Sequence, residues 1–185
     1  MSFRFKTAAV RLTTVCPPTF PEPAMSLPSI SQLAKDAGHY PFQDCRRVPI
    51  AGAADASQLL DAFAHAAPPW VDALMRLRNR LVAPFGLKTG TLAEVGPPYA
   101  VGQSIGLFRV FHLDPVEAIL GEDDRHLDFR ISMLCHDGAL WGCTLVRPHN
   151  RFGRLYLALV MPWHHLIAGA MFRRMAARLN AAVKP

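Results

Sequence analysis

Apolar and polar positions follow two different periods along this chain, and the change of period separates strands from helices. Between residues 108 and 146, short apolar runs alternate with Asp-Pro, Gly and Asp-Gly turn signals, which is typical of antiparallel strands. Four strands are therefore predicted, at Phe108–Leu113, Val116–Leu120, Leu127–Cys135 and Leu140–Val146.

The Asp137-Gly138 pair is the strongest local signal, because a two-residue type I′ turn requires positive φ at both positions. Such a turn sets residue 135 opposite 140 and residue 127 opposite 148. The apolar face of this hairpin then carries Leu127, Phe129, Ile131 and Met133 opposite Leu140, Gly142, Thr144 and Val146. On the other face Asp128 is expected to pair with Arg147, and His126 lies opposite His149.

Helical spacing appears on both sides of these strands. A short strand at Arg46–Ile50 precedes a helix that Asp55 caps and a second helix that begins after Pro68-Pro69. The second helix carries an apolar stripe of Trp70, Leu74, Leu77 and Leu81. A long helix from about Gly153 to Ala182 closes the chain, and Pro162 is expected to kink or divide it. Its apolar stripe consists of Leu157, Met161, His164, Ala168, Phe172, Met175 and Leu179.

A strand, two short helices, a curved antiparallel sheet and a long C-terminal helix form an α+β order that resembles the helix-grip fold of the START-like or SRPBCC superfamily. The chain is most similar to an uncharacterised, mainly bacterial family of that class, over roughly residues 40–180. Three runs carry the resemblance: Leu77-Arg-Asn-Arg-Leu-Val-Ala-Pro-Phe-Gly-Leu-Lys-Thr89, Leu120-Gly-Glu-Asp-Asp-Arg-His-Leu-Asp-Phe-Arg130 and His149-Asn-Arg-Phe-Gly-Arg-Leu-Tyr156. Relatives of this domain also occur fused to NAD-binding domains, but the Gly-x-Gly-x-x-Gly fingerprint is missing from this sequence.

Length and composition predict a single domain at residues 25–185. Residues 1–24 are proline-rich and are expected to form a disordered extension, with Met25 as an alternative start and an organelle-targeting peptide as an alternative interpretation. The four cysteines, Cys16, Cys45, Cys135 and Cys143, form no CxxC pair, so we expect free thiols and a cytoplasmic location.

Charge is distributed unevenly, since the last 48 residues contain no Asp or Glu while seven Lys or Arg lie from Arg147 to Lys184. These cations sit among large apolar residues rather than in a polar stripe, so nucleic-acid binding is not expected. The apolar run from Leu155 to Phe172 is interrupted by Pro162 and two histidines, which favours a buried or interfacial helix over a membrane span. Weak contact with a membrane surface is compatible with that pattern.

An acidic turn at Glu122, Asp123 and Asp124 and a basic helix start at Asn150, Arg151 and Arg154 are expected to meet at one end of the sheet. Arginines in the first turn of a helix oppose its dipole, so a negative partner is expected there. We expect an ion-pair network with the acidic turn, and the alternative is a binding site for a carboxylate or phosphate.

The apolar faces of sheet and helix predict a cavity for a small apolar or amphipathic molecule that is lipid-like, polyketide-like or quinone-like. Its predicted lining residues are Phe129, Ile131, Met133, Thr144, Tyr156, Met161, His164 and Phe172. We expect no metal site and no cofactor, because HxxxH spacing is missing and adjacent His164 and His165 diverge on a helix.

Two other functions remain open. A cyclase, aromatase or hydrolase acting in the same cavity would use His164 for acid–base chemistry, whereas the His126, Asp128, Arg130 and His149 group is more typical of a solvated sheet face. A dimerising interaction module is the other alternative, because Leu134, Trp141 and Leu145 make the outer sheet face too apolar for a free surface.

Overall fold

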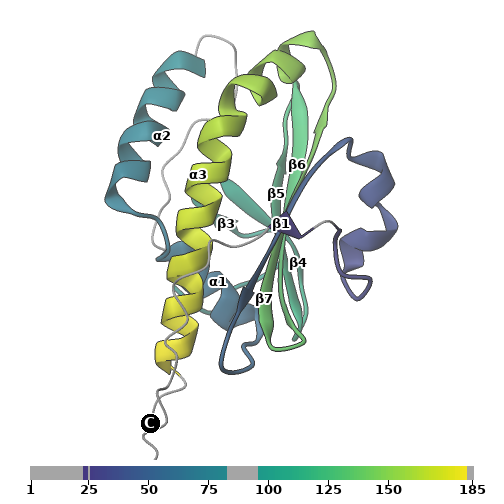
Figure 1. Cartoon of the computed structure of the whole chain (residues 1–185). Coiled ribbons are helices and arrows are strands. Elements are labelled where there is room, and N and C mark those ends of the chain that lie inside the picture. Colours follow the sequence, from purple (N-terminus) through teal and green to yellow (C-terminus); the bar gives the residue numbers. More distant parts are fainter. Residues whose placement is uncertain (1–22, 25, 83–95, 183–185) are drawn as a thin grey trace, which may run out of the picture.

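The computed structural model describes residues 23–24, 26–82 and 96–182 and shows one curved antiparallel sheet with a long helix across its concave face (Figure 1). The order of the sheet is β1-β2-β7-β6-β5-β4-β3. Its strands are β1 Pro23–Ala24, β2 Phe42–Pro49, β3 Ser104–Ile105, β4 Phe108–Leu113, β5 Glu117–Asp123, β6 Leu127–His136 and β7 Ala139–Pro148. The helices are η1 Gln32–Lys35, η2 Ala37–His39, α1 Ala56–Ala64, α2 Pro69–Val82 and α3 Arg151–Ala182. The α+β class and the two short helices after the first long strand are as predicted.

The β6–β7 hairpin has the predicted turn and register. Asp137 has φ 50° and Gly138 has φ 65°, which are the two positive values that a type I′ turn requires. Cys135 pairs with Leu140 and Leu127 pairs with Pro148. The apolar face of this hairpin therefore lies toward α3, as the alternation of residues predicted.

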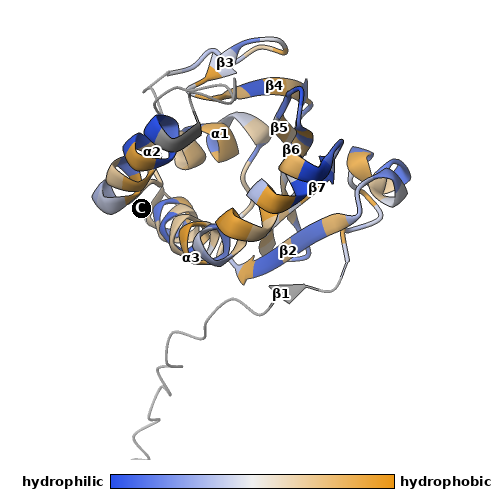
Figure 2. Ribbon diagram, turned by 90° about the horizontal axis from the view of Figure 1, so that it is seen from above, coloured by the Kyte–Doolittle hydropathy of each residue, from blue (hydrophilic) through white to orange (hydrophobic). Residues whose placement is uncertain are grey.

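Helices α1, α2 and α3 close over the concave face, as the view from above shows (Figure 2). Asp55 caps α1 through a capping box with Gln58, and α1 buries Leu59, Leu60 and Phe63 in the main core. The C-terminal half of α3 is held in the same core by its buried side chains, which include Met171, Phe172, Met175 and Leu179. Helix α3 runs through Pro162 without being divided.

The stripe predicted for α2 is not a buried one. Trp70 is 39% exposed and Leu77 is 53% exposed, whereas Val71, outside the predicted stripe, is buried. The side chain of Leu81 lies outside the described residues. Spacing showed that the segment is helical, but it did not show which face packs on the protein.

The convex face of the sheet is covered by residues 26–40, for which the sequence predicted no element. Leu33 and Tyr40 pack with Cys45, Cys143 and Leu145 in a second hydrophobic cluster. The apolar residues that suggested a dimer interface are thus already covered in part, since Leu134 and Leu145 are fully buried within the chain. The outer-face argument for a dimer is therefore wrong.

A buried carboxylate anchors this covering segment. Glu117 on β5 accepts hydrogen bonds from the hydroxyl groups of Ser31 and Ser132 and from the backbone N–H of Gln32. All three donors are neutral, and they satisfy a carboxylate that is only 2% exposed. The segment is therefore fixed by polar contacts as well as by packing.

Cys45 and Cys143 form a disulfide, which corrects the prediction of four free thiols. The two residues are direct partners across β2 and β7, with their Cα atoms 4.1 Å apart. Cys135 is a free cysteine, as the hairpin register required, and Cys16 lies outside the described residues. The cysteines therefore no longer support a reducing compartment.

The proline-rich extension is described only at its end. Pro23 and Ala24 pair with Arg46 and Cys45 at the edge of the sheet, so the predicted boundary at residue 24 falls within an ordered contact. An edge position suits proline, which cannot donate a ladder hydrogen bond. Residues 1–22 and Met25 lie outside the described part of the chain.

Candidate functional site

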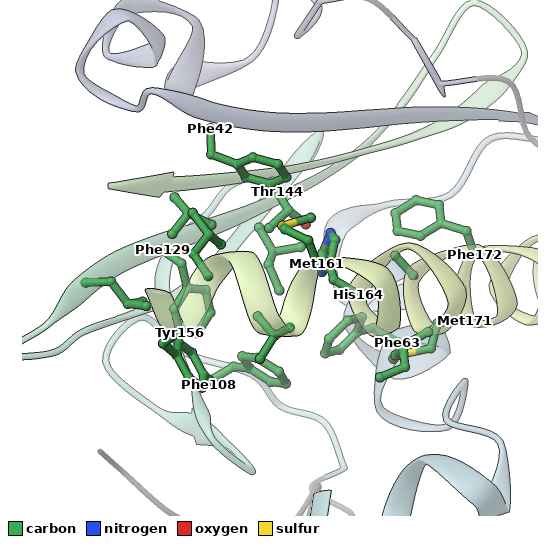
Figure 3. Close-up of a pocket in the computed structure, with 17 residues that line it drawn as sticks. Phe42, Phe63, Phe108, Phe129, Thr144, Tyr156, Met161, His164, Met171 and Phe172 are labelled. Atoms are coloured by element: carbon green, nitrogen blue, oxygen red, sulfur yellow. The ribbon is translucent and has the colours of Figure 1, made fainter. Parts of the chain in front are cut away.

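A cavity of about 210 Å³ lies between the concave face of the sheet and α3 (Figure 3). Its walls are almost entirely apolar, and aromatic side chains from five different elements line it. The sheet contributes Phe42, Phe108, Leu127, Phe129, Ile131, Thr144 and Val146, and α1 contributes Phe63. Helix α3 contributes Tyr156, Leu157, Val160, Met161, His164, Ile167, Ala168, Met171 and Phe172.

One end of the cavity is closed by Phe172, whose ring occupies the space above Gly142. A Cβ atom added at Gly142 would lie 1.4 Å from Cζ of that ring, so only glycine fits there. The Phe108 ring packs edge-on against Phe63 and Phe129, with centroids 5.5 and 5.8 Å apart. Because these side chains interlock, the cavity is set by the fold rather than by a single loop.

Three polar side chains interrupt the apolar wall, namely Thr144, Tyr156 and His164. The hydroxyl oxygen of Tyr156 accepts a hydrogen bond from Nε of Arg78, 3.0 Å away, and the guanidinium stacks over the Tyr156 ring at 5.7 Å. Since the oxygen already accepts, the hydroxyl hydrogen of Tyr156 can be donated to a bound molecule.

His164 is hydrogen-bonded to a buried carboxylate that the sequence did not predict as part of the site. Its Nε2 lies 3.1 Å from Oδ2 of Asp44 on β2, and Asp44 is only 7% exposed. The carboxylate can only accept, so Nε2 donates and Nδ1 becomes the acceptor of the neutral imidazole. Nδ1 has no hydrogen-bond partner among the residues that the structure describes.

This free acceptor is accessible. Among the described side chains, no fully buried nitrogen or oxygen lacks a hydrogen-bond partner. Nδ1 of His164 must therefore face space that water or a ligand can enter, and His164 is part of the cavity wall. His164 therefore contributes one oriented hydrogen-bond acceptor at the wall of an otherwise apolar cavity.

Arg46 and His165 complete the polar cluster around Asp44. Both Nε and Nη2 of Arg46 donate to Oδ2 of Asp44, at 3.2 and 2.9 Å. Nη2 also lies 2.9 Å from Nδ1 of His165, which must accept because a guanidinium only donates. The cluster joins β2 to α3 along one side of the cavity.

The charge state of Asp44 follows from these contacts. Burial raises the pKa of Asp44, but the hydrogen bonds from His164 and Arg46 and the charge of Arg46 outweigh burial and lower the pKa to about 2. Asp44 is therefore a carboxylate at neutral pH, and it fixes both the orientation and the tautomer of His164.

Seven of the eight predicted lining residues do line the cavity. Met133 does not, because it is fully buried and belongs to the core. Asp44 and Arg46 were missed because the first strand was predicted to begin at Arg46. A strand that begins at Phe42 places Phe42, Asp44 and Arg46 on one face by period two.

The predicted ion pair between the acidic turn and the start of α3 is wrong. Asp123 pairs with Arg130 at 2.8 Å, and Glu122 lies 4.0 Å from Arg109. Oδ1 of Asp124 accepts from the backbone N–H of His126. Arg109 and Arg130 lie on β4 and β6, the strands beside β5, and within the described chain no ion pair reaches Arg151 or Arg154.

The start of α3 is instead capped by Asn150. Its Oδ1 accepts from the backbone N–H of Gly153 at 2.9 Å, and its Nδ2 reaches the carbonyl oxygen of Arg125 at 3.4 Å. A Cβ at Gly153 would lie 2.1 Å from the carbonyl oxygen of His126, so the helix start packs directly on the β5–β6 turn. A helix end satisfied in this way does not require an anion.

The charged group on the convex face forms one of its predicted pairs. Asp128 binds Arg147 at 2.6 Å and His149 at 2.8 Å. Burial raises the pKa of Asp128, and the hydrogen bonds from Arg147 and His149 together lower it below its usual value. None of these residues lines the cavity, so they are separated from the candidate site by the sheet.

Within the described residues, no group of three or more His, Cys, Asp or Glu could hold a metal ion.

The fold and site define an α+β protein of helix-grip layout with an apolar cavity under its C-terminal helix. The model of a protein family of unknown function, DUF2867, matches residues 37–171, so the chain belongs to that family. This agrees with the predicted membership in an uncharacterised family over residues 40–180. No curated protein and no solved structure matches the chain.

Proposed function

We propose that this protein binds a small apolar or amphipathic molecule in the cavity between the sheet and α3. The observation that carries the proposal is a chamber of about 210 Å³ whose walls are apolar except for Thr144, Tyr156 and His164. Binding sites for small molecules typically combine apolar walls with a few oriented polar groups. The helix-grip layout supports the same proposal through its resemblance to START-like proteins.

The size of the cavity limits the part of the ligand that is enclosed. A cavity of about 150 Å³ lined by aliphatic and aromatic side chains holds benzene. By that scale, this cavity encloses about eight to ten non-hydrogen atoms, which corresponds to a substituted aromatic ring. A quinone or polyketide-like ring fits inside, whereas a longer lipid-like chain must extend out of the cavity.

The polar groups indicate how such a ring is oriented. Nδ1 of His164 accepts from a hydroxyl group, and the hydroxyl hydrogen of Tyr156 is available to a carbonyl oxygen. A phenol, enol or hydroxyquinone carries one or both of these groups. The ligand is therefore an apolar ring with at least one hydrogen-bonding oxygen.

A thermal-shift series tests the proposal. Naphthols, hydroxyquinones and short fatty acids are titrated into the protein and into the Ala168→Leu and Val160→Phe variants, which fill the cavity. Ala177→Leu, at an exposed position of the same helix, is the matched control. We expect stabilisation of the wild type and the control that both filled variants lack. Equal shifts in all four proteins, or none in any, contradict the proposal.

Acid–base catalysis is a second candidate function, and the Asp44–His164 pair favours it. A carboxylate that orients an imidazole leaves the other ring nitrogen able to abstract a proton from a bound molecule. Incubation of 1,3-dicarbonyl compounds in D₂O, followed by NMR of the acidic C–H, measures that activity directly. Exchange above the buffer rate that is lost in His164→Ala supports catalysis, and exchange at the buffer rate leaves ligand binding alone.

A further inference from the structure

Helix α3 exposes a second apolar face, opposite to the one that lines the cavity. Its outward side chains are Leu155, Leu159, Trp163 and Leu166, which are 69, 68, 52 and 53% exposed. The intervals of four, four and three residues place them in one line along the helix, over about 16 Å at 1.5 Å per residue. We call these four residues the outer stripe.

The first half of α3 is therefore apolar on both sides. Tyr156, Val160 and His164 face the cavity in the same turns in which the outer stripe faces away from the protein. A helix that is apolar all round is normally buried, but only 17% of the most apolar 18-residue window of α3 is buried. This combination points to a partner that covers the outer stripe.

The charges beside the outer stripe determine which partner fits. Arg151 and Arg154 are exposed just before it, and Arg174 and Arg178 are exposed after it. From Gly138 to the end of the sequence there is no Asp or Glu, so α3 offers only positive charge around its apolar line. A second copy packed through the same helix would bring these arginines together without any carboxylate on α3 to pair with them.

We propose that the outer stripe docks on the surface of a bilayer that contains anionic phospholipids. A helix with large apolar side chains, an interfacial tryptophan and flanking arginines is the type that lies in the headgroup region of such bilayers. By length and composition α3 also passes as a membrane-spanning helix. It does not span here, because its inner face binds the sheet and His164 is bonded to Asp44 on β2.

This proposal does not depend on the identity of the cavity ligand, but it places the cavity close to a bilayer. The outer stripe and the cavity lie on opposite sides of the same three turns of α3. A protein docked in this way holds its apolar chamber one helix away from the bilayer, which is the reservoir for poorly soluble molecules.

Co-sedimentation with vesicles tests the proposal. The full chain is mixed with vesicles of phosphatidylcholine alone or of phosphatidylcholine with phosphatidylglycerol, at low and at high salt. We expect binding to the anionic vesicles only, and weaker binding at high salt because exposed charges are then screened. A blue shift of tryptophan fluorescence, lost in Trp163→Phe, is expected with the same vesicles.

Variants at exposed positions distinguish binding through the outer stripe from nonspecific adsorption to vesicles, and they leave the core unchanged. Leu155→Gln and Leu159→Gln are expected to weaken vesicle binding at least about tenfold, and Arg154→Gln about fivefold. Leu77→Gln, the same change at an exposed leucine of α2, is the matched control and should bind like the wild type.

Three outcomes overturn the proposal. The first is no binding of the wild-type protein to anionic vesicles, and the second is equal binding by the stripe variants and Leu77→Gln. The third is a dimer in light scattering that Leu159→Gln converts to a monomer, because a second copy then covers the outer stripe.

Discussion

Oδ2 of Asp44 lies 3.1 Å from Nε2 of His164, across the seam between β2 and α3. The contact joins a strand from the start of the domain to the helix at its end, and it places a carboxylate–imidazole hydrogen bond beside an apolar cavity. Its consequences for stability and for the cavity can be measured separately.

Stability at acid pH tests the charge of Asp44. Its folded pKa of about 2 lies below its ordinary value of 3.8, so the contribution to stability is present above pH 3.8 and is lost as the pH falls through 2. We expect a loss of about 2 kcal/mol from this group, from the difference between the two pKa values. Urea unfolding from pH 5 to pH 1.5 should show a smaller acid loss in Asp44→Asn. The same acid loss in both proteins contradicts this account.

The close contact of Gly142 with Phe172 predicts that a side chain at residue 142 lowers the stability of the protein. In Gly142→Ala the Phe172 ring must move, and we expect a loss of about 1–3 kcal/mol of unfolding free energy, as for other overpacked cores. Gly38→Ala is the control, since a Cβ there meets nothing within 4 Å. Addition of Phe172→Leu to Gly142→Ala should restore most of the stability. An unchanged melting curve for Gly142→Ala shows that the contact is not as close as described.

The disulfide between Cys45 and Cys143 predicts the number of free thiols. Thiol titration of the denatured, non-reduced protein should find two, from Cys16 and Cys135. A cross-link that closes a long loop stabilises a fold by about 2–4 kcal/mol, so reduction should lower the melting temperature. Four titratable thiols in the oxidised preparation count against the cross-link.

The effect of Arg154→Glu on stability depends on whether Arg154 forms an ion pair with the acidic turn. Without a carboxylate partner in the described chain, its charge opposes the helix dipole, so Arg154→Glu should stabilise the protein by about 0.3–1 kcal/mol. An ion-pair network with the acidic turn would instead make the same variant less stable. Arg178→Glu, in the last turns of α3, is the matched control and should destabilise by a similar amount. Chemical unfolding of both variants at low salt checks the two signs.

Local patterns predicted the parts of the fold that local chemistry determines. The Asp137-Gly138 turn gave the correct register over the whole β6–β7 hairpin, because a two-residue turn leaves only one pairing. The inner stripe of α3 was also predicted, since period 3.6 is unambiguous over a long helix. Together these two elements gave most of the cavity lining.

Such local patterns could not predict contacts between segments that are distant in the sequence. Cys45 and Cys143 are 98 residues apart and meet because β2 pairs with β7, a pairing between non-consecutive strands that no turn signals. The cover at residues 26–40 was missed because its short 3₁₀ turns have no measurable period.

The same limit explains the two errors at the site. The acidic turn was assigned to the basic start of α3 because both lie at the same end of the sheet, whereas its partners Arg109 and Arg130 lie on the adjoining strands. Asp44 was left out because a predicted strand that began four residues too late could not show that it shares a face with Phe42.

Native mass spectrometry of the purified protein tests most directly whether the cavity holds a small apolar molecule. Wild type and Ala177→Leu, after incubation with hydroxyquinones or naphthols, should each show a bound species at a ratio of one per chain. Ala168→Leu and Val160→Phe should show the free chain only, because their side chains occupy the ligand's space. No bound species in the wild type, or the same bound species in the filled variants, would contradict the proposal that this cavity is the binding site.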